Sequence, residues 1–322
     1  MKPFAYARPR AVSEAIELAR GGATLMAGGT DLLGLMKDGI AAPKRIADIR
    51  DLGPLQGWSR TKGKGIRIGA LVPLVELETS AELARWLPIV NEAMAPAATL
   101  QLRTMGTVGG NLLQRNRCSY FRDEAYPCWL KGGVRCFAIE GDSRLHAIVG
   151  AEECIAVSPS DLAPALIAYD ATVALTGPRG PRTLPLVDLF VTPHGRVRRE
   201  HAIAPDELLI EVRIPENALG RRGAFEKAME RKAWSFAMVS VAVSVKRIGG
   251  VVRDARIVLG GVAPVPWRAR DAEKLLEGRA LDDAACQAAA DAALEHAEPL
   301  KDNGYKVPLA RELVRRNLRR LA

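Results

Sequence analysis

Long hydrophobic runs and aromatic side chains are scarce in this sequence of 322 residues. The longest apolar stretches, such as 237–243, are interrupted by small or polar residues and fall far short of the about 20 residues that cross a bilayer, so we expect no membrane span. Aromatic residues make up only 5%, and the arginines behind the net charge of +9 are widely spread. We therefore expect a soluble globular protein of two or three domains that binds no nucleic acid.

Two common signatures are also missing. No glycines follow the Gly-x-Gly-x-x-Gly order, so an ordinary nicotinamide-binding fold is not supported. The chain begins Met-Lys-Pro-Phe-Ala-Tyr without an apolar export segment, which predicts that it carries no signal peptide of its own. Because disulfides form in oxidising compartments, this start disfavours them without excluding them.

Four of the five cysteines lie close together in the sequence. Cys118, Cys128, Cys136 and Cys154 have nine, seven and seventeen residues between them and share one polar stretch. Four thiols gathered in this way predict a thiolate-bound metal centre. Cys286, by contrast, lies in an alanine-rich segment that reads as a helix face, where a small buried thiol is the ordinary role.

The spacing favours an iron-sulfur cluster over zinc. Structural zinc sites usually contain two cysteines separated by two to four residues, and no such pair is present. A four-iron cluster is larger than a single ion and takes its thiolates from a loop wrapped around it, which suits wide and uneven spacing. Zinc, two disulfides and unrelated buried thiols remain alternatives. His146 lies in the same stretch, and with four thiolates available we expect it to be structural.

Two glycine-rich loops predict an anion-binding site. The first loop, 26–34, reads Met-Ala-Gly-Gly-Thr-Asp-Leu-Leu-Gly, and the second loop, 104–111, reads Thr-Met-Gly-Thr-Val-Gly-Gly-Asn. Backbone N–H groups of glycines approach an anion without a Cβ in the way. Either loop alone is as well explained by a tight connection, but together they could hold the two phosphates of a dinucleotide from opposite sides.

The periodicity of apolar residues divides the chain into three units. Residues 1–57 alternate strand and helix signals, with a helix over 13–19 that begins at a serine placed to cap it. Residues 58–220 form a second unit, and residues 221–322 form a separate α+β unit that ends in an amphipathic helix rich in arginine. Further strands are expected at 66–70, 172–176, 208–214, 239–245 and 255–259.

Considered jointly, these features resemble the FAD-binding subunits of molybdenum hydroxylases, the xanthine oxidase and carbon monoxide dehydrogenase family. The resemblance implies an α+β fold, with a two-part FAD-binding domain of the vanillyl-alcohol-oxidase (PCMH) type in 1–57 and 58–220, followed by an α+β C-terminal domain in 221–322. It spans nearly the whole chain and rests on Ala27-Gly-Gly-Thr-Asp31, Thr107-Val-Gly-Gly-Asn111, Pro159-Ser-Asp161, Lys227 with Arg231, and Gly260-Gly-Val-Ala-Pro264.

An inserted loop at 115–155 carries the four cysteines and narrows the resemblance to a subgroup of this family. Most members of the family pass from the second glycine loop to the Pro-Ser-Asp segment within a few residues. The flavin subunit of 4-hydroxybenzoyl-CoA reductase has a four-iron cluster in a comparable loop and is the alternative. The insertion is more similar to that of periplasmic aldehyde oxidoreductases, through Gln114-Arg115, Arg117-Cys-Ser-Tyr-Phe-Arg-Asp123, Glu140-Gly141 and Arg144-Leu-His-Ala147.

The resemblance implies two cofactors, FAD and a [4Fe-4S] cluster held by Cys118, Cys128, Cys136 and Cys154. The glycine loops would bind the FAD pyrophosphate and ribityl chain, Asp161 would accept a hydrogen bond from FAD, and Lys227 would lie near the isoalloxazine ring. The plainer alternatives are a helix N-cap for Asp161 and a surface position for Lys227. The implied FAD contacts are Met26, Ala27, Gly28, Gly29, Thr30, Asp31, Leu32, Leu33, Gly34, Thr104, Thr107, Gly109, Gly110, Asn111, Asp161 and Lys227.

The implied function is electron transfer within a heterotrimeric, molybdenum-containing aldehyde oxidoreductase, with no catalytic residue in this chain. Electrons would pass from a large molybdenum-cofactor subunit, through a small subunit with two [2Fe-2S] clusters, to the FAD and then to an external acceptor. Related complexes are exported folded, so we expect the cytoplasm, or the periplasm if a partner carries the signal. A self-contained flavin oxidase and a zinc-stabilised interaction module are the rivals, although no histidine lies in either glycine loop.

Overall fold

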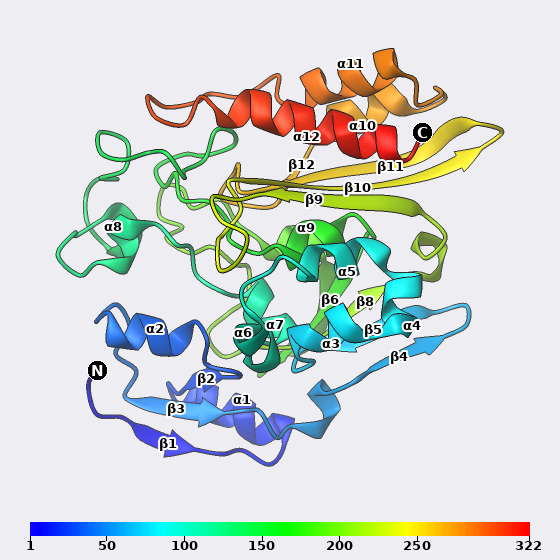
Figure 1. Ribbon diagram of the computed structural model, residues 1–322. Coiled ribbons are helices and arrows are strands. Elements are labelled where there is room, and N and C mark those ends of the chain that lie inside the picture. The colour runs from blue at the N-terminus through cyan, green and yellow to red at the C-terminus, as the bar shows by residue number, and fades with distance from the viewer.

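The computed structural model describes all 322 residues and arranges them around three β-sheets stacked along one direction (Figure 1). The N-terminal sheet lies at one end, the C-terminal sheet with its helices at the other, and a five-stranded sheet lies between them. No helix of the chain is long and apolar enough to cross a membrane.

The N-terminal sheet is a small parallel βαβ unit, as its alternating pattern predicts. Its three strands pair in the order β1 (Ala5–Ala7), β3 (Arg45–Asp48) and β2 (Thr24–Met26). The helices are α1 (Val12–Arg20) and α2 (Leu32–Lys37). The predicted serine cap of α1 is wrong, because the helix begins one residue earlier, with Ala11 at the N-cap and no side-chain cap. The Glu14 carboxylate instead accepts from the N–H of Arg10 at 2.7 Å.

The five-stranded sheet is antiparallel and forms the centre of the largest core. Its order is β4 (Trp58–Thr61), β5 (Gly65–Gly69), β8 (Leu208–Ile214), β6 (Thr172–Gly177) and β7 (Gly180–Pro185). Short helices share this core: α3 (Leu74–Thr79), α4 (Ala81–Trp86), α5 (Pro88–Met94), α7 (Val108–Leu112) and α9 (Leu162–Ile167). Helix α6 (Leu100–Met105) packs on α3. Single 3₁₀ turns occupy Gly53–Leu55, Trp129–Lys131, Leu186–Leu189 and Glu216–Ala218.

The C-terminal sheet is covered on both faces. Its antiparallel order is β12 (Trp267–Arg268), β11 (Val251–Gly260), β10 (Val239–Ile248) and β9 (Arg222–Ala228), and β10 and β11 meet at the predicted Gly249-Gly250 turn. One face packs on α5 and α9, and the other on α10 (Arg270–Leu276), α11 (Asp283–Ala293) and α12 (Lys306–Arg320) (Figure 1). The alternating pattern of 239–245 predicts a strand, and this strand is buried on both faces because small side chains, Ser240, Ala242 and Ser244, alternate with the valines.

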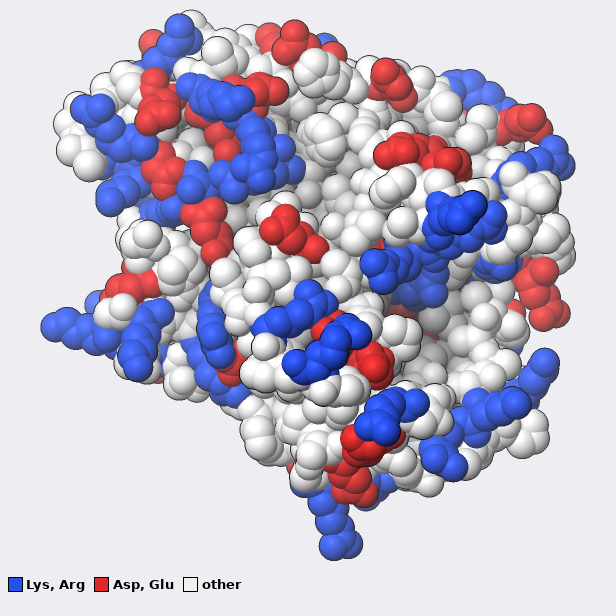
Figure 2. Space-filling view, turned by 180° about the vertical axis from the view of Figure 1, so that it is seen from behind, with Lys and Arg blue, Asp and Glu red and all other residues white.

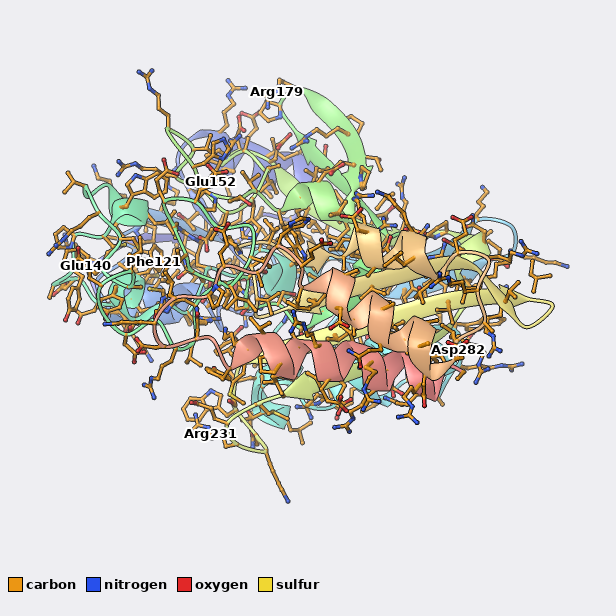
Figure 3. The ribbon with its side chains drawn as sticks, turned by 90° about the horizontal axis from the view of Figure 1, so that it is seen from above. Phe121, Glu140, Glu152, Arg179, Arg231 and Asp282 are labelled. Atoms are coloured by element: carbon orange, nitrogen blue, oxygen red, sulfur yellow. The ribbon has the colours of Figure 1, made fainter.

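The cysteine segment, 115–155, contains little regular structure apart from α8 (Ser119–Arg122) and lies beside the stack (Figure 1). Figure 3 shows Phe121 and Glu140 of this segment at one end of the molecule, far from Asp282 at the start of α11. Five of its residues form a small buried apolar cluster together with Leu35 of α2 and Ala156. The segment is therefore held largely by contacts with its neighbours.

The arginines of α12 are occupied by acidic partners within the chain. Arg316 pairs with Glu226 at 2.8 Å and Arg319 with Asp283 at 2.9 Å, while Arg320 reaches Glu92 at 3.0 Å. Seen from behind, the molecule carries its lysines and arginines in separate groups with acidic groups between them (Figure 2). The net positive charge is thus not gathered into one continuous surface on this face.

Lys306 at the start of α12 is fully buried without an acidic partner. Its ammonium donates to the carbonyl oxygens of His146 at 2.9 Å and Gly261 at 2.7 Å. Burial lowers the pKa of Lys306 from 10.5 to about 7. A lysine whose charged form is disfavoured by burial thus joins the C-terminal domain to the cysteine segment.

This burial predicts that stability rises with pH between about 7 and 10.5. In that range the unfolded chain holds a proton on Lys306 that the folded chain has released, which gives a slope approaching about 1.4 kcal/mol per pH unit. Lys306→Met should remove that contribution, whereas Lys301→Met, at an exposed lysine nearby, should leave it. Urea unfolding at several pH values measures the difference, and equal slopes for wild type and Lys306→Met would contradict the assignment.

Candidate functional site

Two glycine loops face one another in a cleft between the N-terminal sheet and the five-stranded sheet. The first follows β2, and the second joins α6 to α7. A Cβ placed on Gly28 would lie 1.7 Å from the carbonyl oxygen of Met105, so the two backbones touch. Only glycine permits this approach.

The first loop presents free backbone donors to this cleft. The N–H groups of the five residues 28–32 donate no hydrogen bond within the chain. Gly29 has a φ of 72°, in the left-handed region that favours glycine. A short turn with successive unpaired N–H groups is a concave anion site, so the loop fits a phosphate or pyrophosphate group.

The cleft consists of two adjoining cavities that share residues of both loops. Thr30, Asp31, Gly110 and Gln114 line both cavities. One cavity continues along Met26–Gly29 and Gly109 towards β8, and the other continues past Asn111 to Asp161 and the loop 234–236. An elongated ligand held by both loops therefore fits the space, as FAD requires.

Several residues that were expected to contact FAD form hydrogen bonds or ion pairs within the chain instead. Asp31 accepts from the N–H of Arg115 at 2.8 Å and from the guanidinium groups of Arg117 and Arg122. Burial alone would raise the pKa of Asp31, but the two guanidiniums and the Arg115 N–H lower it overall. Asp31 therefore ties the first glycine loop to the start of the cysteine segment, a role that the sequence pattern did not indicate.

The hydroxyl groups of both threonines in the second loop also form hydrogen bonds within the chain. The Thr107 hydroxyl accepts from the N–H of Gly110 at 3.1 Å and caps α7. The Thr104 hydroxyl donates back to carbonyls of its own helix, and Thr104 lines an adjoining outer hollow and neither cavity of the main cleft. Leu33 and Gly34, at the end of the first loop, are absent from the cavity walls.

Asp161 and Lys227 form a buried ion pair at the inner end of the cleft. The Lys227 ammonium lies 2.8 Å from the Asp161 carboxylate, and its side chain is only 1% exposed, so the surface alternative for Lys227 is wrong. Burial raises the pKa of Asp161, and the positive charge of Lys227 opposes this. Asp161 lines the cavity, whereas Lys227 lies behind it on β9.

The predicted N-cap role of Asp161 is taken by its neighbour. Asp161 occupies the N-cap position of α9, but its side chain makes no cap. The Ser160 hydroxyl accepts from the N–H of Ala163 at 3.0 Å and donates to the Asn111 amide oxygen at 2.6 Å. Ser160 thus links the second glycine loop to α9, and the Pro-Ser-Asp motif was the signal that could have identified it.

Sequence reasoning also missed the loop 229–238, which walls the inner cavity. Trp234 has a φ of 51°, a strained value for an aromatic residue, and its carbonyl accepts from the Arg231 guanidinium at 2.9 Å. Arg117 lies 5.0 Å from the centre of the Phe236 ring. Figure 3 shows Arg231 on this loop at the edge of the molecule, pointing away from the C-terminal helices.

The four clustered cysteines line one small cavity. Aromatic and apolar side chains complete its walls, among them Phe121, Trp129, Leu130 and Phe137. All five cysteines of the chain are free, and Cys286 is buried on α11, as its alanine-rich segment indicates. No three His, Cys, Asp or Glu side chains lie close enough together to hold a single metal ion.

Burial keeps two of these thiols, those of Cys118 and Cys154, protonated. It raises the pKa of Cys118 to about 11, against opposing backbone hydrogen bonds from Phe121 and Tyr120, and raises the pKa of Cys154 to about 12. His146 Nε2 lies 3.2 Å from the Cys118 sulfur. The cavity also adjoins the flavin side of the molecule, because Cys118 and His146 both line a hollow next to Asp161.

The fold and the cleft define a protein that binds a flavin dinucleotide between two halves of one domain and adds a second α+β domain. Residues 2–217 match the FAD-binding domain in molybdopterin dehydrogenase, and residues 224–321 match the CO dehydrogenase flavoprotein C-terminal domain. The chain therefore belongs to the family of FAD-binding subunits of molybdopterin-dependent hydroxylases. It is an FAD-binding oxidoreductase subunit, as the motif resemblance predicts.

Individual relatives match over the whole chain. The aldehyde oxidoreductase FAD-binding subunit PaoB of Escherichia coli (strain K12) is 39% identical over 97% of this chain and 96% of that protein. The carbon monoxide dehydrogenase medium chain of Hydrogenophaga pseudoflava is 31% identical over 98% and 96%. The solved carbon monoxide dehydrogenase from that organism aligns at a TM-score of 0.79 and 30% identity, over 99% of this chain and 98% of that chain. The predicted α+β fold is confirmed.

Gly28→Ala should disrupt flavin binding. The new Cβ would meet the Met105 carbonyl, and separating the loops should cost about 1–3 kcal/mol, which lowers FAD affinity by about 5-fold to 150-fold. Gly34→Ala is the matched control, because nothing lies within 4 Å of its Cβ and alanine favours α2. Bound flavin per chain and the melting temperature measure both effects. Normal flavin content in Gly28→Ala would contradict the contact.

Lys227→Met should destabilise the fold strongly, because it leaves the Asp161 carboxylate buried without its cation. We expect a loss of roughly 3–5 kcal/mol. The double variant Asp161→Asn with Lys227→Met should recover part of that loss, because no buried charge remains. Urea unfolding of the single and double variants gives the comparison, and a cost below about 1 kcal/mol for Lys227→Met would show that the pair is solvated.

Proposed function

We propose that this chain is the FAD-binding electron-transfer subunit of a molybdenum-containing aldehyde oxidoreductase. The observation that carries the proposal is the full-length similarity to PaoB together with four cysteines around one cavity. When bound, FAD accepts electrons and passes them singly or in pairs to an acceptor. Residues of this chain would hold FAD and exclude water from it. Asp161 would accept a hydrogen bond from FAD at the inner end of the cleft.

Two partner subunits follow from this assignment. The relatives are named as a FAD-binding subunit and as medium chains, which are parts of larger complexes. We propose a large subunit with the molybdenum cofactor, a small subunit with two [2Fe-2S] clusters, and an external acceptor for electrons leaving the FAD. We also propose domain boundaries at 57/58 and 220/221, since each sheet keeps all its strands between them.

The cysteine cavity supports a [4Fe-4S] cluster in the insertion. On a single zinc ion the sulfurs lie about 2.3 Å from the metal, and therefore within about 4 Å of one another. Here four thiols surround one cavity, yet no three lie within reach of a single ion. Four thiols arranged around one apolar cavity in this way suit an inorganic core with volume of its own.

Metal and flavin analysis of the purified complex tests the function. We expect one flavin in this chain, about four irons with matching sulfide in its insertion, and about four more irons with molybdenum in the partners. Aldehyde oxidation should reduce the flavin only in the complete complex. Flavin with neither iron nor molybdenum would instead support a self-contained oxidase. Reoxidation of the reduced flavin by an aromatic acyl-CoA, which takes up the electrons, would support the reductase alternative.

Replacing one cluster cysteine should remove the iron from this subunit. Cys128→Ala leaves three thiols around the cavity, and we expect loss of about four irons per complex together with the broad visible absorption of the cluster. Cys286→Ala is the control, because this thiol is buried on α11 away from the cavity and its loss should leave iron content unchanged. Undiminished iron in Cys128→Ala would refute the ligand assignment.

A further inference from the structure

His146 contacts one of the four cavity cysteines in a fixed geometry. Its Nε2 atom lies 3.2 Å from the Cys118 sulfur, and the residue is 6% exposed. The other ring nitrogen, Nδ1, is buried and has no hydrogen-bond partner. A buried polar atom without a partner is uncommon, so the ring is held there by something other than its own hydrogen bonds.

The C-terminal domain holds the backbone of His146. The His146 carbonyl accepts from the Lys306 ammonium at 2.9 Å and from the Asn303 amide at 3.3 Å, and its N–H donates to the Ser143 carbonyl at 3.0 Å. Neighbouring residues are fastened in the same way, since Tyr305 donates to the Arg144 carbonyl at 3.0 Å. Residues 301–306 therefore act as a strap across 140–147.

A metal-bound thiolate carries no proton, so a hydrogen bond between Cys118 and His146 has only one possible direction. Nε2 must carry the proton and donate it, and Nδ1 then keeps a lone pair, consistent with its lack of an acceptor. Hydrogen bonds to cluster sulfurs stabilise the more negative, reduced state, because the sulfurs then hold more charge.

We propose that His146 donates its Nε2 hydrogen to the Cys118 thiolate and raises the reduction potential of the cluster, acting as a positioning residue outside the ligand set. The proposal rests on the cluster assignment made above. It also gives the strap a function, because the distance from Nε2 to sulfur depends on Lys306 and Asn303. Cys118 and His146 both line the hollow next to Asp161, so the tuned ligand is the one facing the flavin side.

Redox titration of the purified complex, followed by electron paramagnetic resonance of the cluster, tests this inference. His146→Phe removes the donor, and we expect the oxidised-to-reduced ratio at fixed potential to rise about tenfold, equivalent to about 59 mV for one electron. His146→Gln keeps an N–H at similar reach and should shift the ratio less. His194→Phe, at an exposed histidine of another loop, should leave the potential unchanged.

Iron content distinguishes a failure of the cluster assignment from a failure of the donor role proposed for His146. If the wild-type insertion contains no iron, the cluster assignment fails. If iron is present in all variants and His146→Phe titrates like wild type, or His146→Gln shifts as far as His146→Phe, the cluster stands and the donor role of His146 is wrong.

A measurement on the wild type covers the case in which His146→Phe loses its cluster. Electron spin echo modulation of the reduced complex, labelled with ¹⁵N-histidine, should show one weakly coupled nitrogen from the hydrogen-bonded ring. Absence of histidine modulation would overturn the proposal. A strong coupling would also overturn it, because direct coordination by nitrogen would make His146 a ligand, as in Rieske centres.

Discussion

The backbone contact between the two glycine loops is the constraint on which the flavin cleft depends. Gly28 lies against the Met105 carbonyl because neither residue places an atom between the two backbones. The contact joins the N-terminal sheet to the five-stranded sheet and leaves residues 28–32 with unpaired N–H groups facing the cleft. Unpaired donors cost stability in an empty protein, so a bound anion stabilises the arrangement that the loops impose.

The cysteine segment extends this constraint to the C-terminal domain. At its start, Asp31 of the first glycine loop accepts from three arginine donors of the segment. At its other end, Lys306 and Asn303 hold the His146 carbonyl. A displacement of either neighbour would move the cysteines, so the position of the metal cavity depends on both the flavin loops and α12.

The sequence predicted those features whose signal is local. Glycine pairs mark close backbone approaches, and the alternating apolar pattern of 239–245 marks a strand, although not its burial on both faces. It did not predict what the polar side chains of the loops do, because Asp31 and Thr107 find partners inside the chain before a ligand is considered. The strap formed by residues 301–306 could not be predicted from the sequence for a related reason. Lys306 and His146 are 160 positions apart, and the motif Arg144-Leu-His-Ala147 gives no sign of a partner in α12.

The small core of the insertion bears on how the cysteine segment becomes ordered. Only five residues of this segment of about forty join its apolar cluster, and α8 is its only α-helix. Burial holds the Cys118 and Cys154 thiols protonated, so forming the proposed centre must release those protons, and its binding free energy then contributes to folding. The contacts of Asp31 and Lys306 with the segment limit its conformations before the metal centre forms. They therefore reduce the entropy lost when the four thiols converge. The ionic and hydrogen-bonded contacts at the two ends of the insertion are therefore part of its metal site.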